Sequence, residues 1–175
     1  LAVPTTIENA FITEDQVDRG GMPWDYKPAL PPREIWQRVE KVWQDLEGMG
    51  AITLPTCVPY LHLSIPRIGE THAWIESNAA CYANSMLGAR VNRDPGNIAF
   101  YAAITGVIPE YLMHLDECRR GQMIFEIDSD LVTELDDIAD YVALGGAVGF
   151  KATDKVPVIV GLQSMTNEQA KAFCA

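Results

Sequence analysis

Short apolar runs alternate with helix-like segments along this chain of 175 residues, and that order restricts the fold more than any other feature. Apolar or alternating runs predict strands at residues 3–6, 51–56, 123–127 and 156–162. Helical spacing of apolar residues predicts helices at 32–48, 73–88, 97–105, 133–144 and 167–172. Strands that alternate with helices indicate an α/β fold, in which a parallel or mixed sheet forms a layer with flanking helices.

Glycines and caps refine this outline. Gly106 is expected to end the helix at 97–105, and residues 20–32 are expected to form a loop rich in Gly and Pro. Thr133 is a plausible N-cap, with Asp136 where a capping box usually has Glu or Gln. The glycine-rich stretch 145–149 follows a helix and lacks a P-loop lysine, so it predicts a helix stop and a tight turn.

The charge balance bears on the partners of the chain. It has 24 acidic and 13 basic residues, a net charge of −11, and no Lys/Arg run that could neutralise phosphates, so no nucleic-acid partner is expected. No apolar run reaches the ~20 residues of a membrane span. The chain opens without Met and stops within a helix-like pattern, so we expect a single catalytic-domain portion over 1–175, truncated at both ends or processed.

Four cysteines are widely spaced and form no CxxC pair: Cys57, Cys81, Cys118 and Cys174. This pattern favours reduced thiols in a cytoplasmic protein over a disulfide framework. Cys57 stands just past a predicted strand, where a thiolate could bind iron or act as a nucleophile. Burial as a small apolar residue is the commoner role for such a cysteine, and Cys81 is interpreted as packing.

Residues 74–93 hold an unusual density of polar side chains within an apolar frame. Each polar group buried without a partner costs about 1–3 kcal/mol. The segment therefore either pairs internally or binds a polar ligand. Its polar members include Glu76, Ser77, Asn78, Asn84, Ser85, Arg90 and Arg93.

Two further candidates follow this segment. His114 could act as an acid or base, or it could equally be a core imidazole satisfied by backbone groups. Arg119 and Arg120 could bind a carboxylate or phosphate, although a surface turn is the commoner role. The three histidines show no HExxH or paired spacing, so a zinc site has little support.

Taken together, six motifs resemble those of the aconitase X family, a diverged branch of the aconitase superfamily. They are PTT at 4–6, TCVPY at 56–60, WIESNA at 74–79, YANSMLGARVNR at 82–93, AAITG at 102–106 and HLDECRRG at 114–121. The resemblance extends from Val3 to about Ala172 and corresponds to about the middle half of the family's large subunit. Cys118 stands where the family has Asn, and Val91 where it has Thr.

The resemblance implies an aconitase-like domain portion and a hydro-lyase, which removes water from a small hydroxy acid. The first candidate substrate is cis-3-hydroxy-L-proline, and the alternative is mevalonate 5-phosphate. An iron or iron–sulfur centre, [2Fe–2S] or [4Fe–4S], is implied as the Lewis acid. Cys57 is its expected ligand, and the remaining ligands are expected outside this chain.

The resemblance also implies roles for the polar residues and makes ligand binding by residues 74–93 the favoured interpretation. The expected catalytic residues are Ser77, Asn78 and His114. The expected substrate-binding residues are Thr5, Thr6, Glu76, Asn84, Ser85, Arg90, Asn92 and Arg93. The expected partners are a small carboxylate substrate, the rest of the large subunit and a small swivelling subunit or domain. A non-catalytic split subunit that needs a partner chain, and a homologue that binds a carboxylate without turnover, remain open.

Overall fold

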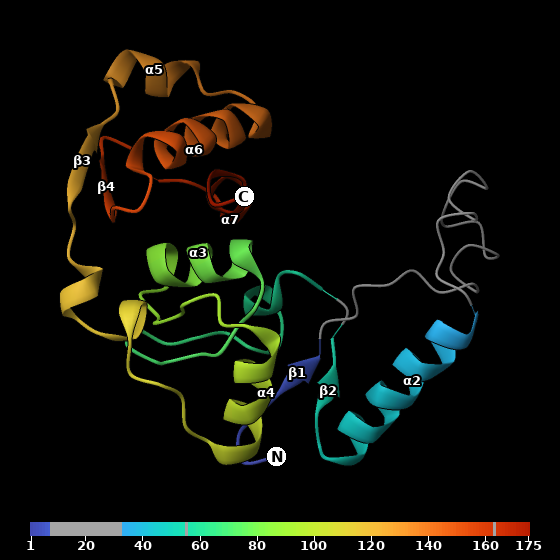
Figure 1. Cartoon of the computed structure of the whole chain (residues 1–175). Coiled ribbons are helices and arrows are strands. Elements are labelled where there is room, and N and C mark those ends of the chain that lie inside the picture. Colours follow the sequence, from blue (N-terminus) through green and yellow to red (C-terminus); the bar gives the residue numbers. More distant parts are fainter. Residues whose placement is uncertain (8–32, 55, 163) are drawn as a thin grey trace.

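The structure is a computed structural model that describes residues 1–7, 33–54, 56–162 and 164–175. The loop predicted at residues 20–32 lies outside the described residues. Within them the chain has an α/β fold, as the alternation of strands and helices predicts (Figure 1). Its strands form two separate parallel pairs, whereas a single layered sheet was expected.

The first parallel pair joins two short strands from the N-terminal third. β1 (Thr6–Ile7) pairs with β2 (Ile52–Thr53), so that Thr6 lies opposite Ile52. α2 (Arg33–Gly48) precedes β2 and ends at Gly48, as predicted. Gly50, just beyond it, has a left-handed backbone at φ 97°. Figure 1 shows α2 extending away from the rest of the molecule. Its apolar residues Ile35 and Val42 are accordingly about half exposed.

Two helices form the centre of the molecule. α3 (Ser77–Met86) begins later than the predicted residue 73. Glu76 has an extended backbone, and its side chain accepts a hydrogen bond from the Ala79 N–H at 3.1 Å and so caps the helix. α4 (Gly96–Thr105) ends at Gly106, which adopts the left-handed conformation at φ 76°. Three single turns complete this region: η2 (Pro59–Leu61), η3 (Leu112–His114) and η4 (Glu117–Arg119).

The second parallel pair lies in the C-terminal third. β3 (Met123–Glu126) pairs with β4 (Pro157–Val160) over four residues, at the positions that the apolar runs predict. α5 (Ser129–Glu134) and α6 (Ile138–Ala152) connect them, and α7 (Asn167–Phe173) packs against α6. The connection between the two parallel strands is thus filled by helices, as is usual for such crossovers.

The helix predicted over 133–144 is confirmed for residues 138–144, but its start and its cap are wrong. Thr133 lies inside α5, and α6 begins instead at Asp137, which forms a capping box with Asp140. The predicted glycine stop at 145–149 is also wrong, because these residues continue α6. A Cβ atom at Gly145 would come within 2.0 Å of the Phe173 carbonyl oxygen. Gly145 therefore permits close packing of α6 on α7, and does not end the helix.

The core joins the N-terminal and C-terminal parts through α3. Tyr60 stacks on Tyr82 at a centroid distance of 4.2 Å, and both pack with Ala170 and Cys174. A second cluster lies on the other side of α3 and contains Ala80, Ala83, Ala89 and Val91. Trp74 contacts both clusters. The small residues of α3 therefore let neighbouring segments approach closely on two sides.

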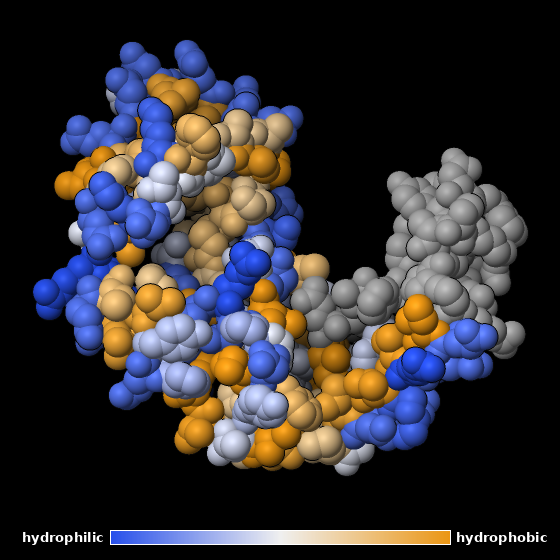
Figure 2. Space-filling view, in the orientation of Figure 1, coloured by the Kyte–Doolittle hydropathy of each residue, from blue (hydrophilic) through white to orange (hydrophobic). Residues whose placement is uncertain are grey.

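Apolar side chains also lie on the surface. Figure 2 shows them gathered over α4 and along α2. Phe100, Tyr101 and Ile104 of α4 are each at least 40% exposed. Among the helices of the described residues, none is long and apolar enough to cross a membrane.

Candidate active site

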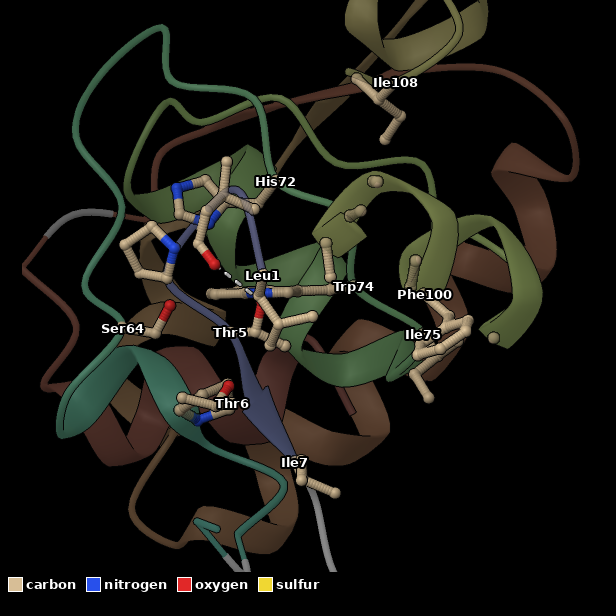
Figure 3. Close-up of a pocket in the computed structure, with 18 of the residues that line it drawn as sticks. Leu1, Thr5, Thr6, Ile7, Ser64, His72, Trp74, Ile75, Phe100 and Ile108 are labelled. Atoms are coloured by element: carbon tan, nitrogen blue, oxygen red, sulfur yellow. Dashed lines mark hydrogen bonds between the residues drawn. The ribbon is translucent and has the colours of Figure 1, made fainter. Parts of the chain in front are cut away.

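A cavity of about 760 Å³ lies between β1, the turn after β2, the segment 70–76 and α4. Figure 3 shows its polar side, where Thr6, Ser64 and His72 gather, and its apolar side, where Ile75 and Phe100 lie. An apolar pocket with a few convergent polar groups is the usual form of a small-molecule site. The polar side chains that line it are Thr5, Thr6, Thr56, Ser64, Glu70, Thr71, His72 and Glu76.

The segment 70–76 forms the wall that carries the charged groups of the cavity, and we call it the cavity wall. It is held to the strand-like segment at Arg90, whose backbone N–H donates to the Glu70 carbonyl at 2.8 Å. The His72 N–H in turn donates to the Arg90 carbonyl at 3.0 Å. These backbone bonds fix the positions of Glu70 and His72 without using their side chains.

Glu70 and His72 face each other at the cavity. The Glu70 carboxylate accepts a hydrogen bond from the Arg67 backbone N–H at 2.8 Å and lies 3.5 Å from His72 Nε2. The Arg67 bond, followed by the His72 contact, lowers the pKa of Glu70 from its ordinary value of 4.5. Glu70 is therefore ionised at neutral pH. The His72 ring also lies against Trp74, with centroids 5.2 Å apart.

The structure brings three of the predicted substrate-binding residues to the cavity: Thr5, Thr6 and Glu76. The Thr5 hydroxyl donates to the Val3 carbonyl at 3.0 Å, and Glu76 caps α3 while it lines the cavity. The other predicted site residues do not line it. They are Cys57, Ser77, Asn78, Asn84, Ser85, Arg90, Asn92, Arg93 and His114.

Asn84 is paired inside the protein. Its amide group donates to the carbonyls of Ala80 and Val91 at 2.8 and 2.7 Å, and its Oδ1 accepts from the Val91 N–H at 3.3 Å. Arg119 Nη1 donates to the same oxygen. One side chain thus holds α3, the strand-like segment after it and η4 together.

Asn78, Arg90 and Asn92 are paired in the same way, and with Asn84 they form what we call the α3 network. Asn78 accepts from the Tyr60 hydroxyl at 2.9 Å, and Asn92 accepts from the Met113 N–H at 2.7 Å. Arg90 donates to the His114 carbonyl at 2.7 Å and to the Asp116 carboxylate. Internal pairing, the less favoured interpretation of the sequence, is therefore what the structure shows for these four side chains.

His114 is buried, 7% exposed, and lies away from the cavity. Its Nδ1 is 2.9 Å from the Pro109 carbonyl, and its Nε2 is 3.9 Å from Oδ2 of Asp94. Asp94 is 1% exposed, and its other oxygen accepts from the Tyr111 hydroxyl at 3.2 Å. Among the described residues, neither His114 Nε2 nor Asp94 Oδ2 has a hydrogen-bond partner. This geometry matches a core imidazole beside a buried carboxylate.

Ser77, Ser85 and Arg93 are exposed on the surface of the chain. Arg93 holds a left-handed backbone conformation at φ 56°, which is uncommon for a residue with a side chain. Cys57 is also exposed, so its burial as a small apolar residue is wrong. It directly follows Thr56, a residue that lines the cavity.

Sequence reasoning missed Glu70, His72 and Asp94. Glu70 and His72 lie two residues apart, just before the polar segment. Their side chains point to the same side only because the backbone there is extended. A signal was nonetheless present, because an extended Glu-x-His places both side chains on one side of the chain. Asp94 carries no such signal, since its burial depends on Trp74 and Tyr111.

These features define a class of protein: an α/β protein with a small-molecule cavity lined by hydroxyls, two carboxylates and an imidazole. Comparison with known families then identifies the chain. The family model for the aconitase X first domain matches residues 1–117, and that for the aconitase X second domain matches residues 121–175. The chain belongs to the aconitase X family, which confirms the resemblance of its motifs.

Individual relatives agree with this assignment. The chain is 33% identical to cis-3-hydroxy-L-proline dehydratase of Hypocrea jecorina, over 100% of this chain and 28% of that protein. It is 36% identical to the phosphomevalonate dehydratase large subunit of Thermococcus kodakarensis, over 81% of this chain and 36% of that protein.

A solved structure is also similar. The crystal structure of Thermococcus kodakaraensis aconitase X in its holo-form matches with a TM-score of 0.76 at 32% identity. The match covers 98% of this chain and 39% of that one. The chain therefore spans well under half the length of these relatives.

Proposed function

We propose that this chain forms part of a hydro-lyase that removes water from a small hydroxy acid, with cis-3-hydroxy-L-proline as the first candidate. Relatives named as dehydratases, at 33% and 36% identity, support the reaction class. The charge of the cavity supports the choice of substrate. Its charged side chains are Glu70 and Glu76, and no Lys or Arg is among its described lining residues.

The two carboxylates favour a substrate that carries a cation. The ring nitrogen of hydroxyproline is a cationic ammonium, which Glu70 or Glu76 can bind as a charge-assisted hydrogen bond. Mevalonate 5-phosphate instead carries a carboxylate and a phosphate, and both would be repelled by these side chains. The hydroxyls of Thr6 and Ser64 can donate to the substrate carboxylate, whereas the Thr5 hydroxyl already donates to the Val3 carbonyl.

Loss of water requires removal of the proton next to the substrate carboxylate and departure of the hydroxyl. We assign proton removal to His72, because its imidazole lines the cavity and lies 3.5 Å from the Glu70 carboxylate, which can orient the ring. His114 was expected in this role, but it is buried away from the cavity.

Cys57 fits one position of an iron or iron–sulfur centre. Its thiol is exposed and follows the cavity-lining Thr56, so a thiolate there is accessible at the edge of the site. Such a centre would act as a Lewis acid on the departing hydroxyl. Within the described part of the chain, no three His, Cys, Asp or Glu side chains are grouped to hold a metal. The other ligands are therefore proposed to come from the rest of the large subunit.

The proposal is tested by incubating the natural protein, prepared anaerobically with its partner subunit, with cis-3-hydroxy-L-proline or with mevalonate 5-phosphate. We expect turnover of the first substrate alone. Turnover of the second alone would overturn the substrate assignment, and bound hydroxyproline without turnover would support a non-catalytic homologue.

The ligand assignment needs its own test, with Cys118 as the matched control. Cys118 is partly buried and stands at a position where the family has Asn. We expect Cys57→Ser to lose bound iron and its visible absorption, while Cys118→Ser keeps both. Full iron content in Cys57→Ser would exclude Cys57 as a ligand.

A further inference from the structure

Two cysteines that the proposed function does not use meet between the first and second domains of the family. Cys81 lies on α3, within residues 1–117, and Cys174 caps the end of α7, within residues 121–175. Figure 1 shows α7 and the C-terminal end of the chain lying over α3.

Side-chain bonds hold these two helices against each other. The Asn78 amide donates to the Lys171 carbonyl at 3.1 Å, and the Tyr82 hydroxyl donates to Asn167 Oδ1 at 3.2 Å. Cys81 lies between Asn78 and Tyr82 in the sequence of α3, one turn after Asn78. Cys174 lies three residues after Lys171, so both cysteines belong to the faces that are in contact.

The environments of the two thiols differ. Cys174 is buried at 8% exposure in the cluster that contains Ala79 and Tyr82, whereas Cys81 is exposed. The two thiols lie near enough to affect each other's ionisation, and the Ser85 side chain also acts on Cys81. The Cys174 side chain, assisted by Ser85, lowers the pKa of the exposed Cys81 thiol to about 7. The Cys81 side chain and burial raise the pKa of Cys174.

We propose that Cys81 and Cys174 form an oxidisable thiol pair, in which Cys81 reacts with a peroxide and Cys174 then closes a disulfide between α3 and α7. The division of roles follows from exposure and packing. The exposed sulfur of Cys81 can meet an oxidant in solution, and the buried Cys174 thiol packs against the same helix, α3, where it can complete the disulfide. The pair is independent of Cys57 and of the proposed reaction.

The chemistry balances with hydrogen peroxide as the oxidant. The Cys81 thiolate attacks one peroxide oxygen, the O–O bond breaks, and a sulfenic acid and hydroxide form. Sulfur is oxidised by two electrons and the peroxide is reduced. The Cys174 sulfur then attacks the Cys81 sulfur, an S–S bond forms, and the S–O bond breaks. The departing hydroxide takes the Cys174 proton and leaves as water.

The consequence is a covalent link between segments that are otherwise joined by hydrogen bonds and packing. A disulfide between residues this far apart in sequence restricts the unfolded chain strongly. Oxidation should therefore raise the Tm of the C-terminal part and fix α7 on α3. Reduction by a dithiol should reverse the change.

The experiment uses the natural full-length protein, reduced and then exposed to a small excess of hydrogen peroxide. Non-reducing peptide mapping should find Cys81 linked to Cys174. In Cys174→Ser, dimedone should label Cys81 as a sulfenic acid, while Cys118→Ser should form the same disulfide as the wild type. Iodoacetamide labelling of reduced wild type should be at least fivefold faster at Cys81 than at Cys118 at pH 7.

Three results would overturn the proposal. One is an absence of the Cys81–Cys174 peptide in oxidised wild type, which needs no variant to fold. Another is a linkage of Cys81 to a different cysteine. The third is labelling of Cys81 that is no faster than that of Cys118.

Discussion

The cavity wall at residues 70–76 and the α3 network are both rich in polar groups, yet they place those groups in opposite ways. In the α3 network, Asn84 bonds to two carbonyls, a backbone N–H and Arg119. In the cavity wall, backbone bonds hold the segment in place, so that Glu70 and His72 present their side chains to the cavity. Polar density in a sequence therefore does not distinguish a binding site from a structural network.

The hydrogen-bond partners of the polar side chains distinguish a binding site from a structural network. A polar side chain whose donors and acceptors are all used within the protein stabilises the fold, and it has little capacity left for a ligand. A side chain held at a cavity by its backbone retains that capacity. Substitutions in the two regions should accordingly separate stability from activity.

The largest effect is expected from Asn84→Ala. This change removes the side-chain bonds to the Ala80 and Val91 carbonyls, to the Val91 N–H and from Arg119, so the free energy of unfolding should fall by about 3 kcal/mol. Urea unfolding measures the loss, and Ser77→Ala, an exposed neighbour on the same helix, is the control with a change within about 0.5 kcal/mol. Equal stabilities of the two variants would contradict the structural role of Asn84.

His72→Gln should have nearly as large an effect, but on turnover. Loss of a general base typically costs about 100-fold or more, so kcat should fall by at least about that factor. The unfolding free energy should stay within about 0.5 kcal/mol of wild type, because the His72 side chain is at the cavity surface. His114→Gln is the informative comparison, since its main cost should appear as lost stability. Lost turnover in His114→Gln, with turnover kept in His72→Gln, would indicate that His114 is the base.

Glu76 belongs to both regions, so its two variants sharpen the contrast. Glu76→Ala removes the acceptor for the Ala79 N–H and should destabilise the protein by about 1 kcal/mol. Glu76→Gln keeps an acceptor oxygen and should recover most of that loss. If Glu76 binds the substrate cation, Glu76→Gln will still raise KM. A KM unchanged from wild type would confine Glu76 to capping.

The smallest effect is expected from Glu70→Gln, and it is measured as KM at several pH values. Because bonding lowers the pKa of Glu70 below 4.5, its charge is present above that pH and is lost as pH falls through the folded-state value. Protonation of Glu70 should therefore contribute nothing to the pH dependence of KM for a cationic substrate between pH 7 and pH 5. Glu70→Gln should raise KM about fivefold across this range, consistent with loss of one exposed charge pair. A pH-dependent wild-type KM in this window would point to a different group.

Much of the fold follows from local signals. The apolar spacing and terminal glycines of α2 and α4, and the apolar runs of β3 and β4, lie within the segments they determine. The glycine stop predicted at 145–149 failed, because Gly145 of α6 serves a contact with Phe173, far along the chain. No local pattern encodes such a contact.

The site was harder to predict for the same reason. Thr5, Thr6 and Glu76 reach the cavity as expected. Asn84 was assigned to a ligand because its partner Arg119 lies beyond the polar segment, and a sequence shows polar groups without showing which are already paired. Glu70 and His72 were missed because the extended backbone that aligns them depends on pairing with Arg90.

The most direct test is a crystal structure of the natural protein, carrying His72→Gln to slow turnover, with cis-3-hydroxy-L-proline bound. The ring nitrogen should lie within hydrogen-bond distance of the Glu70 or Glu76 carboxylate, and the α3 network should keep its internal bonds. A substrate held instead by Asn84 and Arg90, with their internal bonds broken, would contradict the division between cavity wall and network.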